Sequence, residues 1–423
     1  MFSRLLYSFV FYLIVPIILL RLLIRGLKAE QYWQRWDERF GQIPKIWAQK
    51  RPIWVHAVSV GEFIAATPIV NRLLRDDSDA VIVITTMTPT GSERVKAVFG
   101  DKVHHFYMPY DLPHVMSRVI TQLKPSVLVI METEIWPNLV YHSHANNVPV
   151  LLANARMSER SAKGYQRFSS LTRQTLERIT LVAAQNPADA ERFIDIGALP
   201  ERTRVMGNVK FDLKIPASLR EQSLAFRLQW GVNRPVWIAA STHEGEDEQI
   251  LQLHKRILEA IPDVLLVIVP RHPERFDKVA NLAKKLGYVV GRRSGSLEHK
   301  EDINIFVGDT MGELMLFLSA SDVAFIGGSL IPSGGHNVLE ASALGLPVVF
   351  GPHMFNFSEV SRLILDAKAG LQVEGGEQLA STIINLLQSA SDRAELGEQG
   401  IKVVEQNKGA IDILVKEIHK YSD

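Results

Sequence analysis

The chain has 423 residues, no cysteine and a formal net charge of +1. This length is sufficient for two domains with substantial cores, and the ordinary composition excludes a fibrous or low-complexity protein. The near-neutral charge argues against a generally basic nucleic-acid binder. Without cysteine the chain has neither disulfides nor thiolate metal sites, which fits a reducing compartment.

The first fifty residues combine an apolar run with basic and aromatic side chains. Residues 5–20 carry no charge, which is at the short end of the about 17–25 residues that a membrane-spanning helix needs. Arg21, Arg25 and Lys28 follow this run and favour a cytoplasmic location for the rest of the chain. The basic stretch continues to Arg51 and suits the headgroups of an anionic leaflet. Its aromatic residues are Tyr32, Trp33, Trp36, Phe40 and Trp47.

A cleaved signal peptide and a buried core helix are the alternatives for this segment. No small-residue cleavage site follows the apolar run, and Arg21 and Arg25 lie where such a site is expected. The tryptophans also suit a helix packed in a core. We therefore expect a membrane-anchoring helix over residues 1–28, of the transmembrane signal-anchor type.

From Pro52 onward, short apolar segments with strand character alternate with helical segments. This alternation predicts a doubly wound parallel sheet. Right-handed crossovers then bring the C-terminal ends of the strands to one edge, where ligands bind. The strands are expected at residues 53–58, 80–86, 127–131, 149–153, 181–184 and 204–206.

The segment 207–217 breaks this rhythm and is the expected interdomain linker. A second series of strands follows it, so the predicted fold class is α/β with two Rossmann-like doubly wound domains. Residues 29–206 form the first domain, and residues 218–423 form the second, including an amphipathic C-terminal helix over residues 401–421. The strands of the second domain are expected at residues 236–240, 264–269, 288–290, 305–307, 323–326 and 348–350.

The stretch from Asp322 to His353 has the clearest ligand-binding pattern. Gly327 and Gly328 let the backbone approach a ligand closely, and the N–H groups of the following helix favour an anion. We predict that helix over residues 338–344, with Asn337 as its N-cap and Glu340 placed to accept hydrogen bonds from ribose hydroxyls. A glycine-rich βα turn with a dipole-favoured acid is the structural alternative. The glycine density, with a histidine and an asparagine at the helix entry, favours a nucleotide site.

Polar residues also follow several other predicted strands. Glu62 follows the first strand through Gly61 and begins a helix, where an acid that only stabilises the helix dipole is the alternative. Glu132 and Glu134 end the third strand. Arg156 follows the fourth strand and either pairs with those acids or contacts an acceptor.

The second half and the linker contribute further candidates. Arg271 and His272 follow a strand and are placed to donate to a phosphate, although both are also ordinary loop residues. Met311 and Gly312 offer backbone groups to a base and Glu313 begins a helix, while Lys210 lies in the linker. Metal-site patterns are weak, because the histidines and aspartates lack convergent partners. These patterns are His104 with His105, His142 with His144, and the aspartates between Asp76 and Asp79.

Seven motifs, in order along nearly the whole chain, resemble those of the Kdo transferases. These glycosyltransferases move 3-deoxy-D-manno-octulosonic acid (Kdo) from CMP-Kdo to the lipid A precursor in Gram-negative bacteria. The motifs together are far more specific than the glycine-rich segment alone. They are HAVSVGE (56–62), METEIWPN (131–138), NARMSERS (154–161), GNVKFD (207–212), PRHPERF (270–276), GDTMGEL (308–314) and GGSLIPSGGHNVLEASALGLPVVFGPH (327–353).

The resemblance implies a GT-B fold and an inner-membrane enzyme that faces the cytoplasm and needs no metal or cofactor. It implies that the first domain binds the lipid acceptor and the second binds CMP-Kdo. Glu62 would be the general base, and Glu132 and Lys210 would stabilise the transition state. A single displacement without a carboxylate nucleophile implies inversion at the anomeric carbon. The implied CMP contacts are Arg271, His272, Met311, Gly312, Glu313, Asn337, Val338, Leu339 and Glu340.

Two other functions compete with Kdo transfer. A membrane-anchored scaffold or sensor would bind a sugar nucleotide without catalysis, but it has no need of a base at Glu62. A sugar-nucleotide epimerase shares the two-domain fold, but it would not explain the N-terminal anchor. We therefore expect transfer of Kdo to the lipid A precursor lipid IVA, in lipopolysaccharide biosynthesis, with inner-membrane lipid as a partner and without nucleic acid.

Overall fold

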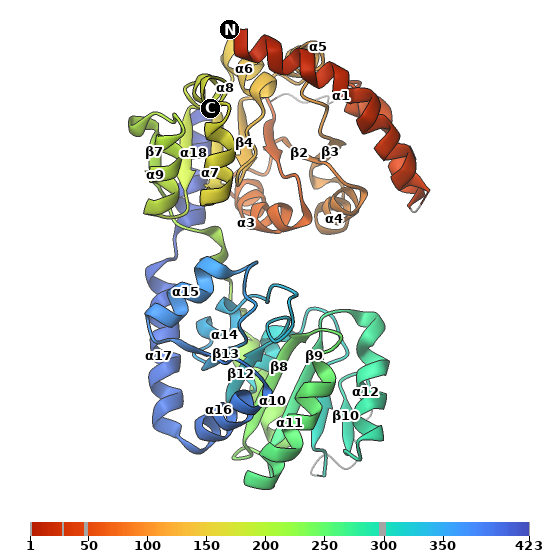
Figure 1. Cartoon of the computed structure of the whole chain (residues 1–423), viewed down its shortest axis with the longest axis vertical. Coiled ribbons are helices and arrows are strands. Elements are labelled where there is room, and N and C mark those ends of the chain that lie inside the picture. The colour runs from red at the N-terminus through yellow and green to blue at the C-terminus, as the bar shows by residue number, and fades with distance from the viewer. Residues whose placement is uncertain (1, 28, 46–49, 296–301, 423) are drawn as a thin grey trace. The chain divides into compact units, whose positions relative to one another are not determined.

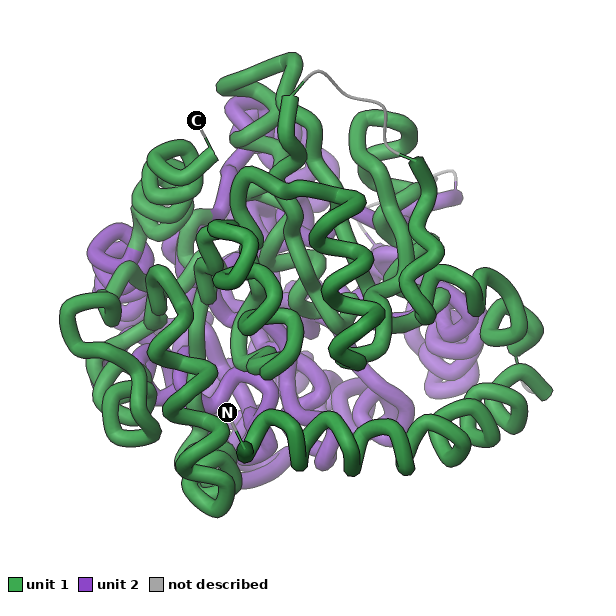
Figure 2. Tube along the Cα trace, turned by 90° about the horizontal axis from the view of Figure 1, so that it is seen from above, with its two compact units in different colours: residues 1–212, 408–423 green, residues 213–407 purple. Residues whose placement is uncertain are grey.

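The computed structural model describes residues 2–27, 29–45, 50–295 and 302–422. Lys28 and Trp47 of the predicted membrane segment lie outside these residues. The chain divides into two compact units, which are residues 1–212 together with 408–423, and residues 213–407 (Figure 2).

The first unit is built on a sheet of seven parallel strands. Its order is β3-β2-β1-β4-β5-β6-β7. The structure confirms the six predicted strands and adds β3, an edge strand whose two histidines do not give an apolar run. The strands are β1 (Ile53–His56), β2 (Ile82–Thr86), β3 (His104–Tyr107), β4 (Val127–Met131), β5 (Val150–Ala155), β6 (Leu181–Ala184) and β7 (Thr203–Val205).

Helices cover both faces of this sheet, because successive residues of each buried strand point to opposite sides. In β1, Ile53 and Val55 enter one hydrophobic core while Trp54 enters the other. Local capping determines where several helices begin: Ser59 and Thr88, for example, accept backbone N–H groups at the starts of α3 and α4. The longer helices are α3 (Val60–Asp76), α4 (Pro89–Phe99), α5 (Pro113–Leu123), α6 (Pro137–Ala145), α7 (Glu159–Gln166), α8 (Ser169–Leu176) and α9 (Pro187–Asp195).

The C-terminal helix α18 (Ala410–Ser422) packs on the first unit. Its residues Leu414 and Ile418 lie in the same core as Ile69 of α3. The carboxylate of Asp212 accepts the backbone N–H groups of Gly409 and Ile411, at 2.5 and 2.6 Å, and so fixes the start of the helix. The expected second domain, residues 218–423, therefore differs from the observed unit, because the apolar face of α18 completes the first core.

The second unit repeats the architecture with a sheet of order β10-β11-β9-β8-β12-β13-β14. All neighbouring strands are parallel. Five of the six predicted strands are confirmed, the strand predicted at residues 288–290 lies two residues later as β10, and the edge strand β14 is added. The strands are β8 (Val236–Thr242), β9 (Leu265–Pro270), β10 (Val290–Arg292), β11 (Ile305–Val307), β12 (Val323–Ile326), β13 (Val348–Phe350) and β14 (Gly370–Gln372).

The helices of the second unit cover its sheet in the same way. Trp237 of β8 packs in a core with Ile250 and Ile383, whereas Phe306 of β11 joins an aromatic cluster with Trp230 and Phe317. The helices are α10 (Leu219–Trp230), α11 (Asp247–Ala260), α12 (Phe276–Lys285), α13 (Leu314–Ser319), α14 (Leu339–Ala343), α15 (Ser358–Asp366), α16 (Gly376–Gln388) and α17 (Ala390–Gln406).

The N-terminal helix α1 (Phe2–Gly26) is long and apolar enough to cross a membrane, with a mean hydropathy of 2.3. It is the one such helix among the described residues. In the structure it runs along the first unit beside α5 and α6 (Figure 1).

Candidate functional site

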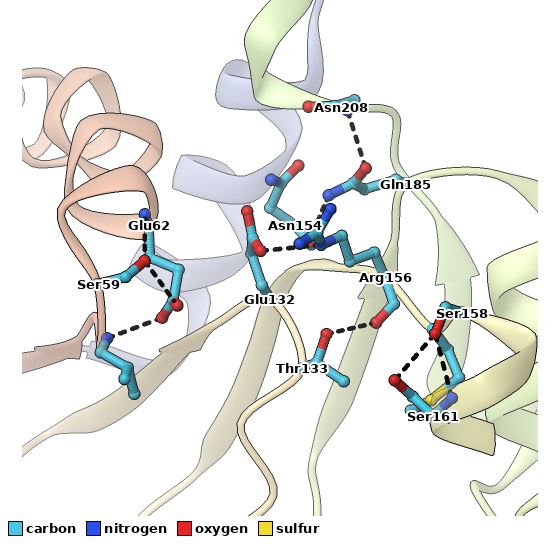
Figure 3. Close-up of polar contacts among 12 residues, drawn as sticks. Ser59, Glu62, Glu132, Thr133, Asn154, Arg156, Ser158, Ser161, Gln185 and Asn208 are labelled. Atoms are coloured by element: carbon cyan, nitrogen blue, oxygen red, sulfur yellow. Dashed lines mark hydrogen bonds and ion pairs between the residues drawn. The ribbon is translucent and has the colours of Figure 1, made fainter. Parts of the chain in front are cut away.

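In the first unit the predicted acidic residues gather at the C-terminal edge of the sheet. Glu132 follows β4 and Asn154 ends β5, and both have left-handed backbone conformations, with φ of 57° and 51°. Such conformations are uncommon for residues other than glycine and concentrate at functional sites, where the surrounding structure compensates their cost. The two strained positions therefore mark this edge as a candidate site (Figure 3).

Glu62 lies in the first turn of α3 and forms a capping box with Ser59. The Ser59 hydroxyl accepts the backbone N–H of Glu62 at 3.2 Å, and it donates to the Glu62 carboxylate at 3.0 Å. The same carboxylate accepts the N–H of Val58 at 2.7 Å. Residues 59–62 thus hold the Glu62 carboxylate at the C-terminal end of β1. The carboxylate also contacts the N-terminus of α3, as the alternative of a helix-stabilising acid predicted.

The electrostatic surroundings of Glu62 suit a proton acceptor. The residue is only 8% exposed, and burial raises its pKa from 4.5 to about 7, against the hydrogen bond from Val58. The nearby negative charges of Glu134 and Glu132 raise the pKa further. A general base works best when its pKa lies near the working pH, so Glu62 meets that electrostatic requirement at neutral pH.

The two acids after β4 have separate partners. Glu132 pairs with Arg156, whose Nε lies 2.9 Å from the carboxylate. Glu134 accepts the Nε1–H of Trp136 at 2.9 Å, and burial raises its pKa. Of the two roles considered for Arg156, the ion pair with the acids is the one present in this structure.

Lys210 lies at the same edge, in a turn that an amide network holds in place. The Lys210 backbone N–H donates to Asn208 at 3.0 Å, and the Val209 N–H donates to Asn154 at 3.2 Å. The Gln185 side chain links the ends of β5 and β6 by donating to the Asn154 carbonyl and accepting from Asn208 (Figure 3). Gln185 was not among the predicted site residues, although it directly follows the predicted strand 181–184.

In the second unit, three imidazoles and an arginine converge from three loops, which follow β8, β9 and β12. The Nε2 atoms of His243 and His336 are 2.7 Å apart, and their rings stack at 5.0 Å. His272 packs edge-on against His243. Burial lowers the pKa of His336 to about 4 and also lowers that of His243. In the neutral pair, one ring donates its Nε2–H to the other.

Arg271 lies close enough to these groups for its positive charge to act on them. It lowers the pKa values of His243 and His336, and it opposes the burial-driven rise in the pKa of Glu340. The structure therefore brings together predicted residues from the loops after β9 and β12. The guanidinium and imidazole N–H groups gathered here are of the kind that can donate hydrogen bonds to an anion.

The helix predicted at residues 338–344 is shorter than expected. It is α14, whose assigned N-cap position is Val338, one residue after the predicted cap. Asn337 still makes the capping contact, because its side-chain oxygen accepts the Leu339 N–H at 3.1 Å, and its amide group donates to Glu340 at 3.4 Å. The helix ends before Gly345, whose φ of 74° is typical of a residue that terminates a helix.

The segment from Met311 to Glu313 lies at the C-terminal edge, after β11. Met311 is 62% exposed, and Gly312 has a φ of 84°. The Glu313 carboxylate pairs with Arg293 at 2.8 Å, which holds the pKa of that carboxyl below its usual range. Glu313 is the N-cap of α13, so the helix begins one residue later than predicted.

Glu246 is the main site residue that the sequence analysis missed. It is fully buried, and its carboxylate accepts four backbone N–H groups at 2.6–3.2 Å. Their donors are Gly328, Ser329, Leu330 and His243. Glu246 therefore holds the glycine-rich loop. The sequence does contain a pattern that could have indicated Glu246, because the polar segment 241–246 directly follows the predicted strand 236–240.

Gly327 is required where this loop meets β8. A Cβ atom at this position would lie 2.6 Å from the carbonyl oxygen of Ser241, which itself has a φ of 60°. At Gly327 the close backbone approach is to the neighbouring strand, whereas Gly328 lies against the rings of His243 and His336.

The histidine and aspartate patterns do not assemble into a metal centre in the part of the chain that the structure describes. No group of three or more histidine, aspartate or glutamate side chains there is arranged to hold an ion. His104 and His105 lie on β3, while His142 and His144 lie on α6.

Comparison with known proteins assigns the chain to a family. Residues 34–213 match the family model described as 3-deoxy-D-manno-octulosonic-acid transferase, and residues 239–403 match glycosyl transferases group 1. The chain is 41% identical to the 3-deoxy-D-manno-octulosonic acid transferase of Haemophilus influenzae, over 99% of this chain and 98% of that protein.

Solved structures provide two further similarities. The C-terminal CMP-Kdo binding domain of WaaA from Acinetobacter baumannii is 34% identical, with all of that chain and 45% of this one covered and a TM-score of 0.43. UDP-GlcNAc 2-epimerase from Neisseria meningitidis has the same fold, with 15% identity, a TM-score of 0.57 and coverage of 87% of this chain and 100% of that one. On the family match and its close relative, the chain belongs to the 3-deoxy-D-manno-octulosonic acid transferases, a family of GT-B glycosyltransferases.

Proposed function

We propose that this Kdo transferase moves Kdo from CMP-Kdo to the lipid A precursor lipid IVA, with inversion at the anomeric carbon. The observation that carries the proposal is Glu62, a buried carboxylic acid at the strand edge whose pKa lies near 7. A protein that only binds a sugar nucleotide has no need of an acid with this pKa.

In the proposed reaction, a glucosamine hydroxyl of the acceptor attacks the anomeric carbon of Kdo. Its proton passes to Glu62 as the new oxygen–carbon bond forms. The bond between that carbon and the CMP phosphate breaks, and CMP leaves with the electron pair. A positioned base of this kind contributes roughly 10²–10⁴-fold to the rate.

Two further residues respond to the charges that develop in the oxocarbenium-like transition state. Glu132 is the proposed partner of the positive charge on the sugar, and its pairing with Arg156 holds it in one orientation. Lys210 is the proposed partner of the negative charge on the departing phosphate. The amide network around Asn208 supports this assignment, because it fixes the backbone at Lys210.

The second unit is the proposed binding site for CMP. Arg271 and His272 would bind the phosphate, in the cluster with His243 and His336. Glu340, held by Asn337, would accept from the ribose. Met311, which is exposed, and Gly312 would contact the base through their backbone groups, next to Glu313. Val338 and Leu339 are buried at the start of α14, so their part in the site would be to hold the backbone beside Glu340.

The proposed location is the cytoplasmic side of the bacterial inner membrane, with the first unit binding the lipid acceptor. The apolar helix α1 supports this location, since the acyl chains of the acceptor stay in the bilayer. Arg21 and Arg25 support the orientation, because positive charge beside an apolar segment favours the cytoplasmic side.

Incubation of the purified full-length protein with CMP-Kdo and lipid IVA tests the proposal, with the products read by mass spectrometry. We expect a lipid product heavier by one or more Kdo residues, together with free CMP. An unchanged lipid beside an isomerised sugar nucleotide would indicate the epimerase alternative instead. An unchanged lipid with intact CMP-Kdo would indicate a binding protein without this activity.

A further inference from the structure

We propose that α1 does not cross the bilayer but lies in the plane of its cytoplasmic surface, attached lengthwise to the first unit. This inference rests on the membrane location proposed above and specifies its geometry. It assigns one face of α1 to protein and the opposite face to lipid.

The protein-facing side of α1 makes polar contacts along its first half. Arg4 donates to the Asn138 side chain at 2.9 Å, and Ser8 and Asn138 are hydrogen-bonded at 3.1 Å. Tyr7 donates to the buried carboxylate of Asp111 at 3.0 Å. Near the middle of the helix, the Tyr12 hydroxyl contacts His114 at 2.5 Å.

Apolar packing continues on the same side in the second half. Leu22 of α1 is buried in a cluster with three residues of the first unit, and other α1 residues pack against that cluster. The contacting positions on α1 recur every three or four residues, as one face of a helix requires. The α1 residues are Phe11, Val15, Ile18 and Leu22, and the first-unit residues are Tyr110, Leu112 and Val115.

The opposite side of α1 is apolar and exposed, and no described residue covers it. Its positions also recur every three or four residues, so they form a second stripe. Large apolar surfaces of this kind on soluble monomers are rare, and they mark interaction sites. Arg21 and Arg25 are exposed near the end of the helix, where they can reach anionic headgroups. The exposed residues include Phe2, Leu6, Phe9, Leu13, Ile17, Leu20 and Ile24.

A membrane-spanning orientation is incompatible with these contacts. A helix of 25 residues is about 37 Å long, and the hydrocarbon core is about 30 Å thick. A spanning α1 would therefore have to leave the first unit along most of its length. It would break the hydrogen bond from Tyr7 to Asp111 and those that Arg4 and Ser8 make with Asn138, and it would place Arg4 on the far side of the membrane. The in-plane position keeps every contact and immerses only the exposed stripe.

This geometry links the membrane to the candidate site. Asn138 is the last residue of the METEIWPN motif, and its backbone N–H donates to Asp111, the same carboxylate that accepts from Tyr7. The segment that carries Glu132 and Glu134 thus leads directly into the surface on which α1 rests. The depth of α1 in the leaflet then sets the height of the acidic residues above the membrane.

The absence of cysteine makes a crosslinking test free of background. We would introduce the pair Ser8→Cys and Asn138→Cys into the full chain and treat inverted inner-membrane vesicles with a short thiol-to-thiol crosslinker. The in-plane helix predicts a crosslinked product that migrates differently on a denaturing gel. The matched control is Phe9→Cys with Asn138→Cys, whose first position faces lipid and should crosslink at least tenfold less.

Equal crosslinking of the two pairs, or none in either, would overturn the in-plane position. An independent measurement uses Ser3→Cys and a membrane-impermeant maleimide. Labelling in intact spheroplasts would place the N-terminus in the periplasm and refute the proposal, whereas labelling confined to inverted vesicles would support it. Kdo transfer to detergent-dispersed acceptor by the wild-type chain separates the two proposals, because an active enzyme that fails the crosslinking test refutes only the membrane geometry.

Discussion

Replacement of Glu62 by glutamine separates its role as a base from its role in starting α3. Val58 and Ser59 donate to different oxygens of the Glu62 carboxylate. A glutamine oxygen can still accept the N–H of Val58 while its NH₂ group donates to the Ser59 hydroxyl oxygen, so a contact with each residue can persist. Glutamine cannot accept the acceptor's proton. We therefore expect transfer to fall by roughly 10²–10⁴-fold, with CMP affinity unchanged, since only the proton-transfer step loses its catalyst.

The same substitution has a pH-dependent effect on stability. Because burial raises the pKa of Glu62 from 4.5 to about 7, the folded state holds this proton more tightly than the unfolded state. The stabilisation from Glu62 is thus fully present below pH 4.5 and is lost as the pH rises through 7. At about 1.4 kcal/mol per pKa unit, we expect Glu62→Gln to gain about 2 kcal/mol over wild type between pH 5 and pH 8.

Urea unfolding of both proteins at these two pH values, followed by a probe in the first unit, measures the gain. The wild-type rate provides a second readout, since it should rise about tenfold per pH unit below pH 7 and then level off. Ser59→Ala is the control, because it costs about 1 kcal/mol of helix capping but keeps the base. More than about a tenth of wild-type activity in Glu62→Gln would remove Glu62 from the role of base, and a stability difference independent of pH would refute the raised pKa.

Three further experiments address the donor site. Arg271→Ala should weaken CMP binding by about tenfold to a hundredfold by calorimetry, through loss of a charge-assisted hydrogen bond, and leave the KM for acceptor unchanged. An equal loss in both substrates would instead indicate general damage. Glu246→Gln should weaken CMP binding by at least about tenfold, because the amide NH₂ replaces one carboxylate oxygen and cannot accept the two N–H groups that this oxygen holds. Unaltered affinity would show that the glycine-rich loop holds its shape without this acid. Transfer should persist in excess EDTA, because Arg271 can pair with the single phosphate of CMP and neighbouring imidazole N–H groups can donate to it. A loss of activity that magnesium restores would contradict this expectation.

Much of the fold was predictable because buried parallel strands are continuous apolar runs with clear ends. The strands at residues 127–131, 181–184 and 323–326 agree residue for residue with β4, β6 and β12. The strands β3 and β14 were missed because neither is a continuous apolar run: they carry polar residues such as His104 and Gln372. The C-terminal ends of parallel strands lie at one edge of the sheet. The sequence therefore also predicted that Glu62 and Glu132 lie at that edge.

The sequence could not predict interactions between residues that are distant along the chain. The pairing of His243 with His336, and of Glu246 with the loop at Gly328, joins segments more than eighty residues apart. The raised pKa of Glu62 depends on burial by the folded unit and on the charges of Glu134 and Glu132. None of these properties has a local sequence pattern.

The two terminal helices show the same limit most clearly. The amphipathic pattern near the C-terminus predicted that α18 packs on a domain, but only the complementary surface of α3 decided which one. The apolar run near the N-terminus predicted that α1 avoids water. Hydropathy along a chain does not distinguish burial in lipid from burial in protein, because both environments exclude water equally. The contacts with Asp111, Asn138 and Val115 settle which face of α1 belongs to the protein.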